Sequence, residues 1–180
     1  MTITDIRRGD AENSKPRIPP HNVDAEASLL GAMMLSEEAI STVLELGLTD
    51  QDFYKPAHRH IFDAIRALTI GGEPVDPVTV GEELRKAALL DGIGGLDALV
   101  RLQNATPAIS SAERYAKIVR DAAKLRRVIT AAAAIAEIAY SEPPDVDKAL
   151  DEAESKIYDV SAGKLNEGAQ QLNDLSLIHI

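Results

Sequence analysis

Apolar residues recur every three to four positions along most of the chain, in runs separated by capping residues, prolines and glycines. This period is typical of amphipathic helices that pack around one core. A shorter turn is expected at Thr49 and Asp52, which have capping-box spacing. The five expected helices have these limits: Asn22 to Met34, Ser36 to Gly47, Pro56 to Gly71, Asp76 to about Ala88, and Gly95 to the residues before Pro107.

The pattern changes at Ser110 and Glu113, whose capping-box spacing opens a run without proline or glycine as far as Pro143. A helix of this length extends roughly 45 Å. Asp145 caps a second helix to about Ser161, and the short turn between the two predicts an antiparallel hairpin. We therefore expect an all-α fold with a helical head at 19–108 and a hairpin at 109–162.

The two ends of the chain are polar. Residues 1–18 hold too few large apolar side chains to offset their ordering entropy, so they are expected to form a disordered arm. Residues 163–180 are interpreted as the start of a linker. The last six residues, Leu-Ser-Leu-Ile-His-Ile, form an apolar cluster that does not continue any pattern earlier in the chain, and we assign them no function.

Two stripes with alternating spacings of four and three run along the hairpin and are expected to face each other. On the long helix the stripe is Ile118, Ala122, Leu125, Ile129, Ala132, Ala136 and Ala139; on its partner it is Val146, Leu150, Ala153, Ile157 and Val160. Apolar residues also lie off this seam, at Val128, Ile135, Ile138 and Tyr140. They need a second cover, either the head or, as we favour, a second hairpin in a dimer.

Composition narrows the function. The formal net charge is -10, which disfavours strong DNA binding. A basic stripe on the long helix is better explained by pairing with the acidic second helix, or as a solvated face, than by nucleic-acid binding; it consists of Arg114, Lys117, Arg120, Lys124 and Arg127. The absence of cysteine, of a secretory h-region and of a run of about 18 apolar residues favours a cytoplasmic location and no membrane contact.

No catalytic, cofactor or metal site is predicted. The one Gly-Lys pair, Gly163-Lys164, lacks both the earlier glycine and the hydroxyl of a nucleotide-binding P-loop. His58 and His60 lie two apart on an expected helix and so face different sides. The aromatic residues are more typical of core positions than of a docking cluster; they are Phe53, Tyr54, Phe62 and Tyr115.

The ordered motifs nevertheless resemble one family. Residues 19–22 read Pro-Pro-His-Asn and are followed by Ala25-Glu26 and Leu30-Gly31, as at the start of replicative DnaB helicases. The resemblance continues for about 140 residues. Its further motifs are Asp52-Phe53-Tyr54, Pro56 with His58 and Ile61-Phe62, Pro74-Val75-Asp76, Gly94-Gly95, Thr106-Pro107, Tyr115 with Ile118-Val119-Arg120, and Lys156-Ile157.

The resemblance implies a six-helix head, hairpins that pair into dimers, and three dimers that form a collar. It implies docking of the C-terminal domain of primase, with a helicase loader as a further candidate partner. ATP and magnesium are then expected in a motor domain outside this chain, and the chain itself is expected to be no enzyme. A free-standing helical adaptor or DNA-binding regulator is the alternative. Candidate contacts to another subunit or to primase are Val128, Ile135, Ile138, Tyr140, Leu150, Glu154 and Ile157.

Overall fold

The computed structural model describes residues 17–162, in which every regular element is a helix. The expected linker and nearly all of the expected N-terminal arm lie outside these residues. The head contains α1 (Val23–Met33), α2 (Glu37–Glu45), α3 (Pro56–Ile70), α4 (Pro77–Lys86), α5 (Leu90–Ile93) and α6 (Gly95–Asn104). Two 3-10 turns, η1 (Asp50–Asp52) and η2 (Ile109–Ser111), precede α3 and α7. The hairpin consists of α7 (Ala112–Tyr140) and α8 (Val146–Ala162). The all-α class, the six-helix head and the hairpin are confirmed.

Side-chain capping explains where α1, α2, α4 and α8 begin. The Asn22 side chain accepts a hydrogen bond from the Ala25 amide at 2.9 Å, and Asp76 accepts from the Thr79 amide at the same distance. Asp145 likewise caps α8 through the Lys148 amide at 3.1 Å. Each side chain satisfies an amide that has no partner within the first turn of its helix.

The capping box expected at Ser110 and Glu113 is wrong. Ser110 lies inside η2, and the N-cap of α7 is Ser111, which makes no side-chain cap bond. Glu113 instead pairs with Lys117 at 2.7 Å, one turn further along the helix. The short helix α5 was also absent from the sequence expectation, because four residues are too few to show a periodicity.

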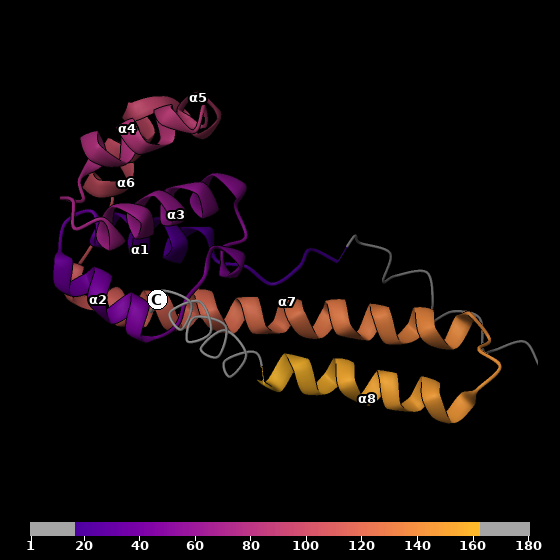
Figure 1. The fold of residues 1–180 in the computed structure, drawn as a ribbon. Helices are drawn as coiled ribbons and strands as arrows, with labels where there is room; N and C mark the ends of the chain where they lie inside the picture. Colours follow the sequence, from indigo (N-terminus) through magenta and orange to yellow (C-terminus); the bar gives the residue numbers. More distant parts are fainter. Residues whose placement is uncertain (1–16, 163–180) are drawn as a thin grey trace, which may run out of the picture.

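The head is layered above the start of the hairpin. Figure 1 shows α4, α5 and α6 at the top, α1 and α3 in the middle, and α2 beside the beginning of α7 at the bottom. The core includes Phe53 and Phe62, whose rings lie 4.9 Å apart, packed with apolar residues of α1 and α3. A Cβ at Gly31 would overlap the Thr106 hydroxyl and the Leu102 carbonyl, so glycine lets α1 approach α6 closely.

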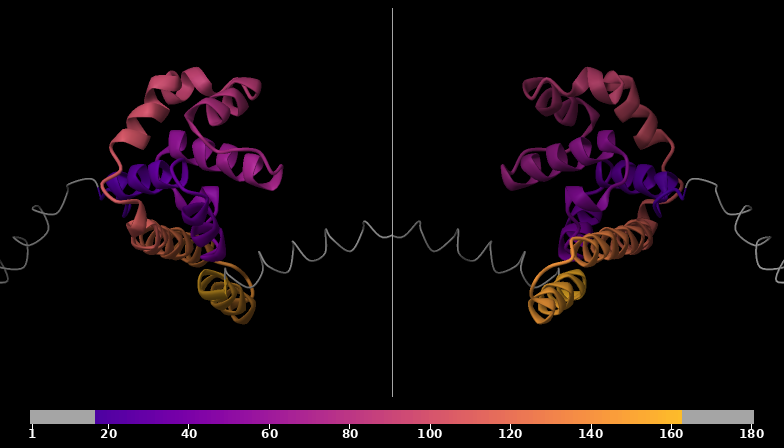
Figure 2. Two further views of the ribbon diagram at one scale, coloured as in Figure 1. Left: turned by 90° about the vertical axis from the view of Figure 1, so that its left-hand side faces the viewer. Right: turned by 90° about the vertical axis from the view of Figure 1, so that its right-hand side faces the viewer.

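The long helix belongs to both parts of the molecule. Its first three turns bury Ala112, Ala116, Val119 and Ala123 in the head, and its second half projects beyond the head. Figure 2 shows that α8 packs on the side of α7 that is turned away from the head. The division of the chain at residue 109 therefore stays a prediction, since α7 is continuous across the two parts.

Candidate functional site

The contact between α7 and α8 uses a different face of α7 from the expected seam. The half-buried residues in the second half of α7 are Ala131, Ala134, Ile135 and Ile138. Their spacing of three and four places them on one face of the helix. On α8 the half-buried residues are Ala149, Ala153 and Val160.

The expected α7 seam is wrong for most of its length: only its last residue, Ala139, lies against α8, in a groove between the two helices. Ile118, Leu125 and Ile129 are 37%, 55% and 51% exposed, and the alanines that continue the stripe at 132 and 136 are exposed too. The head covers the face of Ala112 to Ala123, and α8 covers the adjoining face. We call the remaining face, formed by Ile118, Leu125, Ile129, Ala132 and Ala136, the outer stripe.

A second apolar surface lies in the angle between the two helices near the hairpin turn. It is an open groove of about 390 Å³. Its lining residues are Ile135, Ile138, Ala139, Glu142, Pro143, Val146, Ala149, Leu150 and Ala153. We call it the tip groove. Residues 131–161 carry eight carboxylates and two lysines, so the groove lies in a strongly acidic part of the hairpin.

The structure groups some of the candidate contact residues and separates others. Ile135, Ile138 and Leu150 meet in the tip groove. Glu154 and Ile157 line a shallow depression further along α8. Val128 is 49% exposed and Tyr140 is 83% exposed, and neither lines the tip groove.

Three of the five residues of the basic stripe form ion pairs within α7 or with the head, whereas Arg114 is exposed, as a solvated face would predict. Lys117 pairs with Glu113, and Lys124 lies 3.9 Å from Asp121. Arg127 pairs with Asp52 of η1. None of the ion pairs found in the described part of the chain joins α7 to α8, so the expected pairing with the acidic second helix is wrong in its partner.

Two arginines fasten the turn around η1 to α7. The Asp52 carboxylate is 2% exposed and forms its ion pair with Arg127. Arg126 donates one hydrogen bond to the Asp52 carbonyl at 2.6 Å and another to the Pro20 carbonyl at 2.8 Å. We call this arrangement of Pro20, Asp52, Arg126 and Arg127 the head–hairpin junction.

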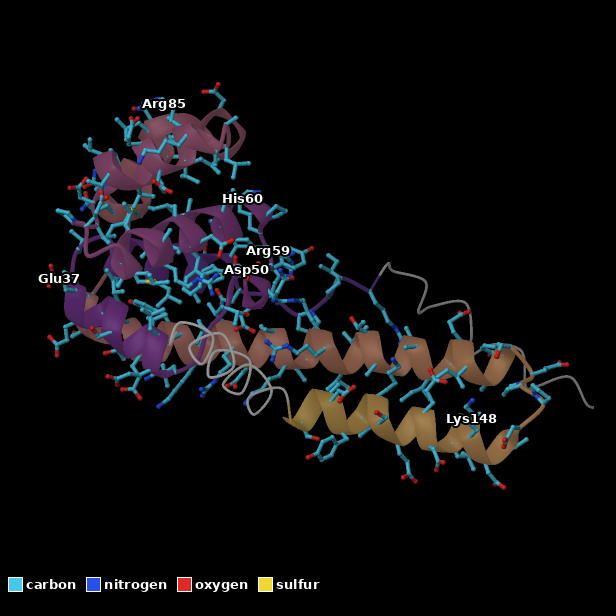
Figure 3. The ribbon with its side chains drawn as sticks, viewed as in Figure 1. Glu37, Asp50, Arg59, His60, Arg85 and Lys148 are labelled. Carbon is cyan, nitrogen blue, oxygen red and sulfur yellow. The ribbon has the colours of Figure 1, made fainter. Side chains whose placement is uncertain are left out.

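The rest of the same turn is held by its own set of contacts. The Tyr54 ring stacks on the His21 ring at 4.2 Å, and the Arg126 guanidinium lies 5.8 Å from the centre of the Tyr54 ring. Arg59, labelled near Asp50 in Figure 3, donates to the Phe53 carbonyl at 2.7 Å. The turn is thus fixed to α3 as well as to α7.

A buried acid lies beneath this turn. Glu26 and His58 are both 1% exposed, and their side chains meet at 2.8 Å. The Glu26 carboxylate also accepts from the Tyr54 amide at 2.6 Å and from the Lys55 amide at 3.3 Å. Burial raises the pKa of Glu26, but the hydrogen bonds from His58 and the two amides outweigh it, so the pKa lies below its ordinary value.

The family motifs contain Glu26, Asp52 and His58, but the sequence pattern predicts a structural role only for Asp52, whose capping box with Thr49 is confirmed. One signal was present: Glu26 lies three and four residues before Leu29 and Leu30, so it shares the buried face of its helix. His58 and His60 do face different sides, as expected, since His58 is buried and His60 is partly exposed. Phe53 and Phe62 are fully buried, and Tyr115 packs against the core.

Neither a metal site nor a membrane span is found among residues 17–162. No group of three or more His, Asp or Glu side chains is placed to hold a metal ion in this range. None of its helices combines the length and the apolar character needed to cross a bilayer.

Comparison with known sequences identifies relatives. The family described as "DnaB-like helicase N terminal domain" matches residues 18–121. Replicative DNA helicase DnaB of Mycobacterium leprae is 43% identical over 161 residues, which are 88% of this chain and 26% of that protein. Its counterpart in Geobacillus stearothermophilus is 40% identical over 159 residues, which are 88% of this chain and 35% of that protein. The chain thus spans about a quarter to a third of the length of these relatives.

Solved structures agree with the sequence comparison. The crystal structure of the N-terminal domain of DnaB helicase from Mycobacterium tuberculosis matches with a TM-score of 0.75 and 42% identity, over 79% of this chain and 99% of that one. A structure of a DnaB-like replicative helicase and its interactions with primase matches with a TM-score of 0.64. The second match has 22% identity and covers 83% of this chain and 35% of that one, so it shows likeness of fold alone.

Proposed function

Because the chain belongs to the family of DnaB-like helicase N-terminal domains, we propose that it is the assembly and docking domain of a bacterial replicative DNA helicase. In this proposal the chain performs no catalysis itself. ATP and magnesium act in the part of the relatives that this chain does not match, where duplex DNA is unwound. A role in bacterial replication places the protein in the cytoplasm.

The exposed outer stripe is the observation that supports an assembly role. It presents large aliphatic side chains to solvent on a projecting helix, and small alanines continue it toward the hairpin turn. Complete burial of one such aliphatic side chain contributes roughly 1.5–3 kcal/mol, so a surface that covers several of them is strongly favoured. Spacings of four and three suit a second helix of the same kind.

We assign the outer stripe to self-association. A two-fold dimer uses the same patch on both copies, and in an antiparallel pair the large residues at one end of the stripe can pack on the alanines at the other end. Three such dimers would form the six-membered collar that the family resemblance implies. Val128 lies at the edge of the stripe and is a candidate for the same interface.

We assign the tip groove to primase. The groove is concave and apolar, and its acidic surroundings suit a partner that presents aliphatic side chains flanked by basic ones. The DnaB-like helicase of similar fold was solved with its interactions with primase. The C-terminal domain of primase is therefore our candidate occupant, through contacts with Ile135, Ile138 and Leu150. A helicase loader is a further candidate partner of the domain.

One set of three variants tests both assignments. Ile129→Asp places a charge on the outer stripe, Leu150→Asp places one at the tip groove, and Val78→Asp changes a 68% exposed residue on α4 as the matched control. Ile135 is a poorer probe than Ile129, because it is half-buried against α8 and its substitution would disturb the hairpin itself.

Sedimentation equilibrium over a wide concentration range should show dimers or their multiples for the unmodified chain, for Val78→Asp and for Leu150→Asp, and monomers for Ile129→Asp. Titration calorimetry with the primase C-terminal domain should show binding that Leu150→Asp abolishes and Val78→Asp retains. Circular dichroism should show equal helicity throughout. A strictly monomeric unmodified chain would contradict the first assignment, and undiminished primase binding by Leu150→Asp the second.

A further inference from the structure

Beyond Tyr115, which packs against the core near the start of α7, the apolar contact between α7 and the head rests on small side chains. Three of the four buried α7 residues are alanines, and the fourth is Val119. Alanines allow two helices to approach closely, but they bury little area and interlock weakly. This contact therefore sets the distance of α7 from the head more firmly than it sets its direction.

The polar contacts of the head–hairpin junction lie one turn further along, where α7 leaves the head. Arg126 and Arg127 follow Ala123 by three and four residues, which places them on either side of the buried face. Each reaches a different atom of the same turn: Arg126 the carbonyl of Asp52, and Arg127 its carboxylate. Contacts on both sides of the helix oppose its rotation and its tilt.

The burial of Asp52 makes these contacts difficult to release gradually. Its carboxylate is already held by the Thr49 amide at 2.8 Å and the Thr49 hydroxyl at 3.3 Å, so it is fixed in place independently of α7. Withdrawal of Arg127 would leave a buried charge without a counter-charge, which is strongly unfavourable. We therefore expect the contacts of Arg126 and Arg127 with the turn to be made or lost together, without stable intermediate arrangements.

We propose that Arg126 and Arg127 are positioning residues, which fix the angle between the head and the hairpin so that the two parts move as one body. The inference rests on the junction alone and does not depend on the proposed function.

The geometry of the hairpin amplifies any change at the junction. Thirteen residues of α7, from Val128 to Tyr140, extend beyond it. At 1.5 Å per residue they form an arm of about 20 Å, so a tilt of roughly 10° moves the hairpin turn by about 3 Å. Surfaces on the outer stripe and the tip groove are displaced with it.

The absence of cysteine from the chain allows a direct test. Spin labels on Glu82→Cys in α4 and Ser155→Cys in α8, both exposed, report the distance between head and hairpin in a pulsed electron resonance experiment. Labelled chains are diluted with unlabelled chains so that only distances within one chain contribute. The otherwise unmodified chain should give one narrow distribution.

Two variants break the junction without leaving a buried charge alone. Asp52→Asn/Arg127→Met removes both charges together, and Arg126→Lys removes the forked guanidinium that serves two carbonyls. Both should broaden and shift the distribution while helicity stays unchanged. Arg127→Lys keeps a positive charge beside Asp52, so this single variant should retain the narrow distance distribution of the unmodified chain. Lys124→Met, at an exposed cation paired within its own helix, is the matched control and should also remain narrow.

The pattern of effects separates positioning from a general loss of stability. Urea unfolding midpoints are measured for every variant, and the broadening should occur well below each midpoint. Distributions as narrow as that of the unmodified chain in both Asp52→Asn/Arg127→Met and Arg126→Lys would overturn the proposal. Equal broadening in Lys124→Met would overturn it as well.

Discussion

At the scale of single residues, the head depends on a carboxylate that apolar packing alone would exclude. Glu26 is enclosed by the core, yet its oxygens are occupied by His58 and by the Tyr54 and Lys55 amides. Those two amides lie at the start of α3, where intrahelical acceptors are lacking. Glu26 therefore completes the beginning of a neighbouring helix and fixes its position relative to α1.

The pKa of Glu26 gives this residue a pH signature. Because it lies below the ordinary value of 4.5, the folded state gains stability from the ionised carboxylate above that pH, and the gain is lost as the pH falls through the folded pKa. Glu26→Gln should lower the free energy of unfolding by about 1–3 kcal/mol at neutral pH. In urea titrations the difference from the unmodified chain should shrink as the pH falls below 4.5.

Glu45→Gln, an exposed substitution at the end of α2, is the control for that experiment and should change stability little at any pH. A difference between Glu26→Gln and the unmodified chain that stays constant down to strongly acidic pH would contradict the role of the charge.

At the scale of elements, the hydrogen bonds at helix ends determine how the chain turns from one helix of the head into the next. The end of α4 is a Schellman motif: the Leu89 amide donates to the Leu84 carbonyl at 2.8 Å, and the Ala88 amide donates to the Arg85 carbonyl at 3.0 Å. This arrangement places Ala88 at φ 57°, a left-handed conformation that glycine adopts without strain. The motif turns the chain from α4 into α5.

Ala88→Gly should therefore raise the free energy of unfolding by about 0.5–1 kcal/mol, because relief of the strain exceeds the added entropy of the unfolded chain. Ala87→Gly is a matched control one residue earlier, where φ is -83°. It should lower the stability, since glycine gains nothing in that conformation. The measurement is urea unfolding, and a loss of stability in Ala88→Gly would show that strain at this turn is negligible.

At the scale of the whole molecule, the distribution of charge leads us to predict weak binding of nucleic acid. The formal net charge is -10, and the hairpin beyond residue 130 is mainly acidic. Three of the α7 cations, Lys117, Lys124 and Arg127, are engaged with Glu113, Asp121 and Asp52. No exposed basic surface of the kind that neutralises several phosphates is therefore formed by α7.

Fluorescence anisotropy with labelled single-stranded and duplex DNA should accordingly detect no strong binding by this chain at physiological salt. Binding that weakens steeply with added salt would instead indicate several phosphate contacts and would favour the alternative of a DNA-binding regulator. A chain in which Arg114 and Lys117 are both replaced by glutamine would then locate the contact.

The local sequence pattern is sufficient to predict every α-helix except the short α5, and their order along the chain. Capping side chains such as Asn22 and Asp145, and the prolines and glycines that bound each run, act within a few residues, so their effects can be read locally. The hairpin followed from the same local rules. The local interpretation failed at Ser110 and Glu113. There the Glu113 carboxylate pairs with Lys117 one turn further along instead of capping the start of α7.

Which faces of those helices are covered, and by what, depends on packing between elements that are far apart in the sequence. The spacing of the outer stripe predicts an apolar helix face. It does not predict whether α8, the head or another chain covers that face, because all three kinds of helix contact use the same periodicity. The pairs Glu26–His58 and Asp52–Arg127 join residues 32 and 75 positions apart. Such contacts form only when packed helices bring together side chains that are far apart in the sequence. A local pattern of a few residues therefore cannot predict them.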